Sequence, residues 1–194
     1  MKKKSYAGYI IGGILVVVGI WLITTYNGLV KKEENMQFQW NEVQNAYQRR
    51  LDLVPNIVSV VRGGAVYEQT TLQKIAEARA KAMAINATGI NAQNYQQQTA
   101  AQDELAAAAN RLLVAVEKYP ELRGTKAFSG LQTQLERTEL RIKIARKDFN
   151  GSVATYNSSV KSFPTKIAAS ILGFDAREGF QSDTGADKSV EIKF

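Results

Sequence analysis

Charged side chains lie within or beside the apolar stripes of the expected helices, and they are the residues whose types could support chemistry. Paired carboxylates can divide the roles of general acid and general base when their pKa values are driven apart. The alternative is structural, because charges between helices fix register and partner choice. The residues open to both interpretations are Arg49, Arg50, Asp52, Glu68, Glu117, Glu136, Glu139, Arg141 and Arg146, and Arg79 is a candidate for the structural role.

The composition favours the structural interpretation. The chain has no histidine and no cysteine, which removes the commonest general base, the thiolate nucleophile and the usual zinc ligands. Most catalytic triads are excluded with them. We therefore predict no catalytic residues, no cofactor-binding residues and no metal ligands.

Two charges interrupt an apolar stripe in the first half of the chain. The stripe consists of Val58, Val61, Ala65, Glu68, Leu72, Ile75 and Arg79. A buried charge must be paired or must reach solvent along its own stem. We predict that Glu68 or Glu139 lies within ion-pair distance of an arginine on a neighbouring helix.

The element that must position most of these residues runs from Phe128 to about Ser162. Its seam repeats at alternating intervals of three and four: Phe128, Leu131, Leu135, Thr138, Ile142, Ala145, Phe149, Ser152 and Tyr156. This spacing predicts a heptad helix on the order of 50 Å long. Such a helix needs partner helices to cover its stripe, so the fold class is all-α.

The N-terminal segment is typical of a membrane anchor. No charged residue occurs from Ser5 to Val30, and Gly8 to Ile23 is continuously apolar. About 20 apolar residues span a bilayer as a helix. No small-residue cleavage site follows, which favours an uncleaved span over a signal peptide. Gly8 and Gly12 are candidates for helix packing in the membrane, or reflect only the general frequency of glycine there.

The lysine distribution bears on orientation. Three lysines precede the span, and Lys31 and Lys32 follow it. The positive-inside rule then favours a bundle outside the cytoplasm, by a margin that leaves the cytoplasmic side open. We predict a single-pass protein of the bacterial inner membrane.

Breaks in the pattern delimit the other helices. A stripe from Met36 to Val54 continues the anchor, and Pro55 predicts a kink or restart that Asp52 could cap. A loop rich in Asn and Gln is expected through Gln98, and a helix is expected from about Ala100 to Lys118.

A short helix should cover Lys166 to Leu172 and end at Gly173, with Phe174 and Phe180 holding the loop after it against the bundle. The predicted organisation is an anchor (1–27), a bundle (28–180) and a polar tail (181–194).

The net charge of +7 does not indicate nucleic-acid binding. Three of the basic residues precede the span, and the others are scattered among acidic ones. No basic run is interleaved with aromatic residues, as phosphate and base contacts require.

Several motifs are similar to those of the LemA family of bacterial membrane-anchored proteins. They are RRLDLVPNIV from Arg49 to Val58, RLLVAVEKYPEL from Arg111 to Leu122, and LERTELRIKIARKDFN with Tyr156 and Asn157. The resemblance covers nearly all of residues 1–180, and the last fourteen residues have no counterpart in it. It implies one N-terminal transmembrane helix and an antiparallel bundle of about four helices, and it supplies no reaction.

Three functions remain open at this stage. The first is a membrane-tethered scaffold or interaction module that self-associates into a homo-oligomer or binds another protein, with Leu140 and Ile144 as a candidate contact face. The second is an oligomeric assembly that remodels or supports the lipid bilayer. It requires a lysine-bearing amphipathic segment beside the anchor, and Lys31 and Lys32 are weak evidence for one. The third is an enzyme that uses carboxylates alone or with a divalent ion.

Overall fold

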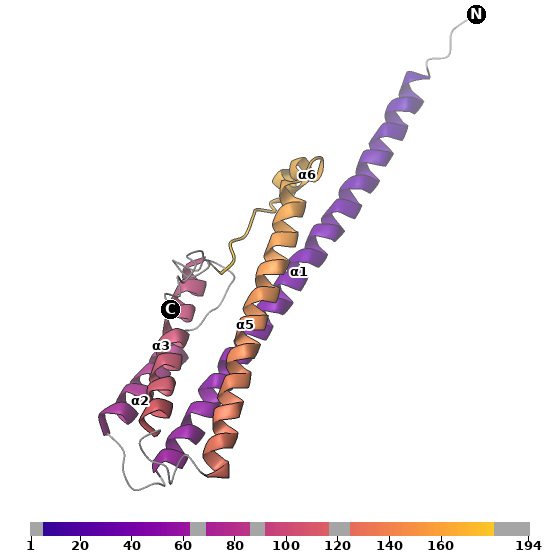
Figure 1. Cartoon of the computed structure of the whole chain (residues 1–194). Helices are drawn as coiled ribbons and strands as arrows, with labels where there is room; N and C mark the ends of the chain where they lie inside the picture. Colours follow the sequence, from indigo (N-terminus) through magenta and orange to yellow (C-terminus); the bar gives the residue numbers. More distant parts are fainter. Residues whose placement is uncertain (1–5, 63–68, 86–91, 117–124, 181–194) are drawn as a thin grey trace, which may run out of the picture.

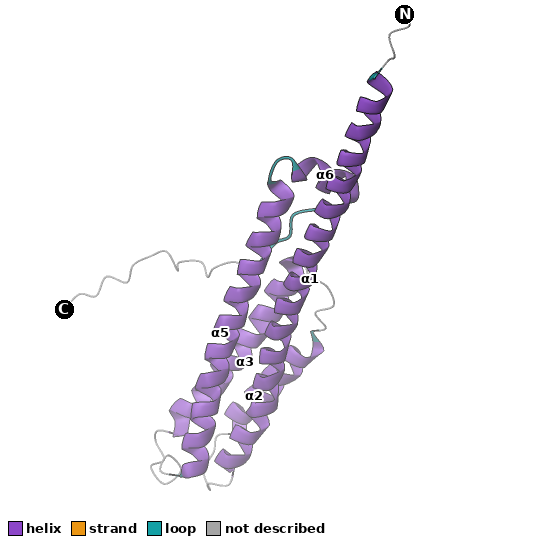
Figure 2. Ribbon diagram, turned by 90° about the vertical axis from the view of Figure 1, so that its right-hand side faces the viewer, coloured by secondary structure: helices purple, strands orange, loops and turns teal. Residues whose placement is uncertain are grey.

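The computed structural model describes residues 6–62, 69–85, 92–116 and 125–180, and all regular structure within them is helical. The helices are α1 (Ala7–Arg62), α2 (Gln69–Ala84), α3 (Ala92–Val116), α5 (Lys126–Lys161) and α6 (Thr165–Leu172). The long helices α1 and α5 run side by side, and α2 and α3 pack together against the half of this pair that is farther from the N-terminus (Figure 1). Figure 2 shows that α1 extends well beyond the bundle at its N-terminal end. The predicted all-α bundle of about four helices is confirmed.

The heptad seam of α5 is its buried face. Eight of the nine predicted seam residues are buried, and Leu131 packs against the core while partly exposed. The helix begins after Thr125, whose hydroxyl oxygen accepts a hydrogen bond from the backbone N–H of Phe128 at 3.2 Å. Such a cap satisfies one of the N–H groups that the first turn leaves unpaired.

The core changes composition along the bundle. Far from the N-terminus, α1, α2, α3 and α5 share one apolar cluster that includes Val54, Ile75, Leu105 and Leu135. In the middle, an aromatic cluster joins α1, α3 and α5 around Trp40. Nearest the N-terminal extension, only α1, α5 and the α6 region remain, around Leu29 and Tyr156 in a third cluster. The bundle therefore tapers from four helices to two long helices and a short one.

Helix α1 continues through Pro55, so a restart near Asp52 to Asn56 is wrong, and the alternative, a kink, stays a prediction. A proline has no N–H to donate to the carbonyl four residues earlier, which here is that of Leu51. Arg79 on α2 replaces the missing donor, because its Nε donates to the Leu51 carbonyl oxygen at 3.0 Å. Asp52 caps nothing and accepts from Gln48 of the same helix at 2.8 Å.

Residues 92–98 of the Asn- and Gln-rich segment are helical, which contradicts the predicted loop there. Helix α3 begins at Ala92. Gln98 is buried and exchanges two hydrogen bonds with Gln44 of α1, at 2.6 and 2.7 Å. Tyr95 is buried in the aromatic cluster. Tertiary contacts on one face thus override the composition of this segment.

The end of the bundle follows the sequence prediction closely. Helix α6 stops at Gly173, whose φ of 77° is the left-handed conformation that glycine adopts most readily. Phe174 packs beside Tyr26 of α1, and Phe180 packs into the aromatic cluster. The predicted polar tail, residues 181–194, lies outside the described residues.

The contact between Arg79 and the Leu51 carbonyl predicts a coupling between Arg79 and Pro55. Arg79→Met should lower the free energy of unfolding by about 1–3 kcal/mol, because it leaves a partly buried carbonyl unpaired. In a Pro55→Ala background the residue 55 N–H can donate to Leu51, so the same substitution should cost less. Urea unfolding of the full chain in mild detergent measures this cycle.

Lys74→Met, on the exposed face of α2, is the matched control and should not depend on residue 55. An equal cost of Arg79→Met in both backgrounds would show that the arginine does not substitute for the proline's missing donor.

Candidate interaction site

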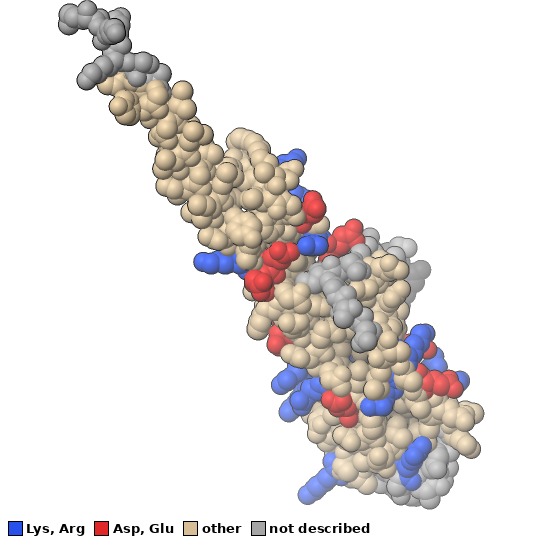
Figure 3. All heavy atoms as spheres, turned by 180° about the vertical axis from the view of Figure 1, so that it is seen from behind, with Lys and Arg blue, Asp and Glu red and all other residues tan. Residues whose placement is uncertain are grey.

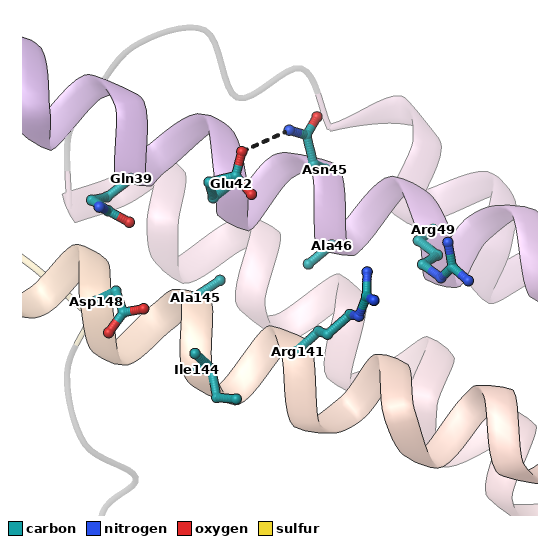
Figure 4. A pocket seen from close by; sticks show the side chains of 9 residues that line it. All are labelled: Gln39, Glu42, Asn45, Ala46, Arg49, Arg141, Ile144, Ala145 and Asp148. Carbon is teal, nitrogen blue, oxygen red and sulfur yellow. Dashed lines mark hydrogen bonds between the residues drawn. The ribbon is translucent and has the colours of Figure 1, made fainter.

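A groove runs between α1 and α5 on the side of this pair that faces away from α2 and α3 (Figure 4). Its volume is about 430 Å³, and we refer to it as the outer groove. Its lining residues are Gln39, Glu42, Asn45, Ala46, Arg49, Arg141, Ile144, Ala145 and Asp148. The floor is formed by small side chains, Ala46 and Ala145, which are buried where the two helices meet.

The charges of the outer groove are separated by sign. Glu42 and Asp148 lie toward one end, and Arg49 and Arg141 lie toward the other (Figure 4). The seven residues from Glu42 to Arg49 make two helical turns, a rise of about 10 Å. The acidic end is nearer the N-terminal extension of α1, because α1 runs away from it. Ile144, with 48% of its surface exposed, provides an apolar contact between the two ends.

Arg50 points into the bundle, although its neighbour Arg49 points into the outer groove. Only 2% of the Arg50 surface is exposed. Its Nη1 donates to the backbone carbonyl of Gln102 at 2.9 Å, and its Nη2 forms an ion pair with Glu139. Arg50 thereby joins α1, α3 and α5, and Glu139 has the arginine partner on a neighbouring helix that the sequence predicted.

Arg146 is held by a second polar network in the middle of the bundle. Its Nε donates to the Tyr47 hydroxyl at 2.8 Å, and its Nη2 pairs with Asp103 at 3.3 Å. The guanidinium lies over the rings of Tyr47 and Phe180, 5.4 and 5.5 Å from their centroids. Burial raises the pKa of the Tyr47 hydroxyl, and the nearby Arg146 charge opposes that shift. Arg146 is therefore a packing and hydrogen-bonding residue of the core.

Two asparagines of α5 hold the segment after α6 against the bundle. Asn150 exchanges hydrogen bonds with the backbone N–H and carbonyl of Phe180, at 2.8 and 3.0 Å. Asn157 does the same with the backbone N–H and carbonyl of Arg177, at 2.8 and 2.7 Å. Seven helical residues rise about 10 Å, as do three extended residues, so the two spacings match. The sequence analysis did not predict this arrangement, and the seven-residue spacing of the asparagines is its signal.

The remaining predicted residues do not converge on one site. Glu136 accepts a hydrogen bond from Gln132 of its own helix, and Leu140 is exposed outside the outer groove. Gly8 and Gly12 face open space on the N-terminal extension. Glu68 and Glu117 lie outside the described residues. Among the residues that the structure describes, no three acidic side chains are grouped closely enough to hold a metal ion.

Sequence analysis did not single out Glu42 and Asp148, although it named Arg49, Arg141 and Ile144 of the same groove. The two carboxylates belong to different helices and are 106 residues apart in the chain. They belong to one site only because of the register between α1 and α5. No local pattern in the sequence gives this register.

The fold and the groove define a class of protein. The N-terminal part of α1 is long and apolar enough to cross a membrane, with a mean hydropathy of 2.1, and it is not buried by the rest of the chain. A helical bundle follows without a break in the helix. This is the architecture of a membrane-associated protein that carries a helical bundle.

Comparison with known proteins places the chain in a family. A sequence profile described as the LemA family matches residues 39–194, and the chain belongs to the LemA family. The match reaches residue 194, so the expectation that the last fourteen residues have no family counterpart is wrong.

The chain is also similar to individual proteins. Magnetosome protein MamQ 1 of Paramagnetospirillum magneticum is 24% identical over 188 residues, which cover 87% of this chain and 69% of that protein. Magnetosome protein MamQ of Magnetospirillum gryphiswaldense gives the same values. Protein LemA of Metamycoplasma hominis is 24% identical over 146 residues, which cover 75% of this chain and 64% of that protein.

The different surroundings of Arg49 and Arg50 predict different effects of the same substitution. Arg50→Met should lower the free energy of unfolding by about 1–3 kcal/mol, because it leaves the Gln102 carbonyl without its donor and Glu139, whose side chain is 41% exposed, without its ion-pair partner. Arg49→Met, the matched control, should change it by less than about 0.5 kcal/mol, because Arg49 is exposed. Urea unfolding in mild detergent distinguishes the two. Equal effects would mean that the buried network does not contribute to stability.

Tyr95 predicts a dependence of stability on alkaline pH. Its hydroxyl is buried without a hydrogen-bond partner among the described residues, and burial raises its pKa. The unfolded state then loses this proton at a lower pH than the folded state, so stability is complete below about pH 10 and falls as the pH rises further. Tyr95→Phe should keep or raise stability at neutral pH by about 1 kcal/mol and should lose less stability above pH 10. The free energy of unfolding of both proteins, measured by urea unfolding between pH 7 and about pH 11, tests this. An equal loss of stability above pH 10 in both would contradict it.

Proposed function

We propose that this protein is a membrane-anchored interaction module and that its outer groove binds a helical segment of another protein. One observation carries the proposal: the groove has an acidic end at Glu42 and Asp148 and a basic end at Arg49 and Arg141 (Figure 4). Within the described residues neither arginine forms an ion pair. These charges remain available to a partner, whereas Arg50 and Arg146 are committed to contacts inside the bundle.

The charge order specifies the chemistry of the partner. A complementary helix carries a basic side chain opposite Glu42 and Asp148, and an acidic side chain two turns away opposite Arg49 and Arg141. An apolar side chain between them packs against Ile144. Such arrangements favour one partner and one orientation over others, because opposed like charges cost energy at an interface.

Self-association through the outer groove is restricted by the same charge order. Two copies anchored in one membrane and pointing the same way would bring acidic end against acidic end. Groove-to-groove contact is complementary only between antiparallel copies, whose anchors lie in different membranes. We therefore propose that a homo-oligomer within one membrane uses another face of the chain.

We propose further that residues 1–27 form the anchor and residues 28–180 the bundle, with residues 181–194 as a tail. The lysine count supports a bundle outside the cytoplasm of a bacterial inner membrane. Helix α1 has no break between the apolar segment and the bundle, so the outer groove is held at a fixed distance from the bilayer.

Membrane remodelling by an ordered assembly is a second candidate. It requires an amphipathic, lysine-bearing segment beside the anchor, and α6 is such a segment: it carries Lys166 and packs against α1. Electron microscopy of liposomes reconstituted with the full chain tests this candidate. Unchanged vesicle shape at high protein density would remove it.

Site-specific photo-crosslinking in native membranes tests the outer groove. A photoreactive residue at Ile144 should crosslink to a partner protein, and one at the exposed Leu140, outside the groove, should not. Adding Arg49→Glu and Arg141→Glu should reduce the crosslink about tenfold, because two favourable pairs become repulsive.

Lys143→Glu combined with Lys147→Glu makes the same two charge reversals at exposed positions outside the groove and is the matched control. Equal crosslinking in the double variant and the control would contradict charge recognition. A crosslink between two copies of this chain would replace the proposed partner with self-association.

A further inference from the structure

Helix α6 turns apolar side chains toward its surroundings. Phe163, just before it, is 83% exposed, and Ile167 and Ile171 are 53% and 74% exposed. On the opposite side, Ala168 and Ala169 are buried against the long helices. Exposed apolar surface of this kind on a short helix is unfavourable in water and indicates that something covers it.

The position of α6 along α1 indicates what covers it. Ala169 shares an apolar cluster with Leu29 of α1, and the ring of Phe174 lies 5.6 Å from that of Tyr26. Residues 8–18 of α1 are exposed, whereas Trp21 and Leu22 are partly buried. Helix α6 thus lies beside the last turns of the apolar segment of α1, at the end of α5 (Figure 1).

Charged contacts between α1 and its neighbours begin just beyond α6, on the side farther from the N-terminus of α1. Lys32 donates to the Ser159 hydroxyl at 2.5 Å, and Arg177 pairs with Glu33 at 3.0 Å. Glu33 is one helical turn from Leu29, about 6 Å farther from the apolar end. In contrast, the face drawn in Figure 3 shows no charged side chain along the free length of α1. The apolar surface of α6 therefore continues that of α1, and the charged residues at this level, Lys161 at the end of α5 and Lys166 on α6, are exposed lysines.

We infer that α6 lies in the lipid–water interface as a second membrane contact, with Phe163, Ile167 and Ile171 at the boundary of the acyl chains. Its one charged residue, Lys166, is exposed and can reach lipid phosphates along its flexible stem. The occupant of the apolar face is the bilayer that holds α1, so the inference rests on the proposed anchoring. A single span leaves rotation about its own axis undetermined. The second contact fixes this rotation and with it the direction that the outer groove faces.

The absence of cysteine from the chain permits a direct test with single-cysteine variants of the full protein. Ile171→Cys and Phe163→Cys report on α6, Val16→Cys reports on the span, and Leu140→Cys reports on the exposed bundle surface. Each carries a nitroxide label in vesicles of phosphatidylcholine and phosphatidylglycerol. Power-saturation electron paramagnetic resonance then compares collisions with oxygen, which concentrates in lipid, and with a water-soluble nickel complex.

The expected result is that labels at 171 and 163 resemble the label at 16, with oxygen collisions several-fold above nickel collisions. The label at 140 should show the reverse. Circular dichroism matching that of the unmodified chain confirms that each variant is folded.

The other outcomes overturn the inference in distinguishable ways. Nickel access at 171 and 163 with a lipid-exposed label at 16 places α6 in water and leaves the anchor intact. Nickel access at 16 as well removes the anchoring itself. Low access to both reagents at 171 and 163 means that protein, such as a second copy, covers α6.

Discussion

Helix α1 is one uninterrupted helix with an apolar part and an amphipathic part, and the rest of the fold follows from this constraint. Its N-terminal part, from Gly8 to about Ile23, carries apolar side chains on all sides, as a lipid-facing helix requires. The part from Leu29 to Val61 buries one stripe and exposes the other side. At 56 residues the helix is about 84 Å long. Every other described helix packs, directly or through its hairpin partner, on this amphipathic part.

The buried stripe on α1 is long, and different helices cover successive parts of it. Four helices share the core at the far end, three share it in the middle, and α6 completes it near the apolar half. Polar contacts also join the helices: Arg79 satisfies the carbonyl that Pro55 leaves unpaired, Gln98 pairs with Gln44, and Arg50 joins three helices. Each contact has specific geometry and therefore fixes register where apolar packing alone would permit sliding. The charges of the outer groove lie on the face of α1 and α5 that is turned away from α2 and α3.

Much of this architecture could be predicted from local patterns. The seam of α5, the stripe of α1, the apolar span and the capped end of α6 all depend on residues close together in the chain. The predictions that were wrong, the restart at Pro55 and the loop before Gln98, concern segments whose helical structure is supported by residues far away in the chain. Pro55 does not end α1 because a donor arrives from residue 79, and the Gln-rich segment is helical because Gln98 meets a glutamine 54 residues away.

The candidate site shows the same limit. Arg49 and Arg50 are neighbours of the same type, and one lies in the outer groove while the other is buried. The sequence identified both but could not separate their roles, because the 100° turn between them has meaning only relative to α3 and α5. Glu42 and Asp148 became part of the site only through helix pairing. Sequence patterns therefore predicted helices well and predicted the surfaces between them poorly.

The central claim is that anchor and bundle form one rigid body held upright on the membrane by α1. Polarised infrared spectroscopy of the full chain in oriented lipid bilayers tests it most directly, because amide dichroism reports the mean orientation of all helices. The account predicts strong dichroism, with the bundle helices aligned near the membrane normal together with the span. Dichroism no larger than that of one short span diluted by randomly oriented helices would contradict it.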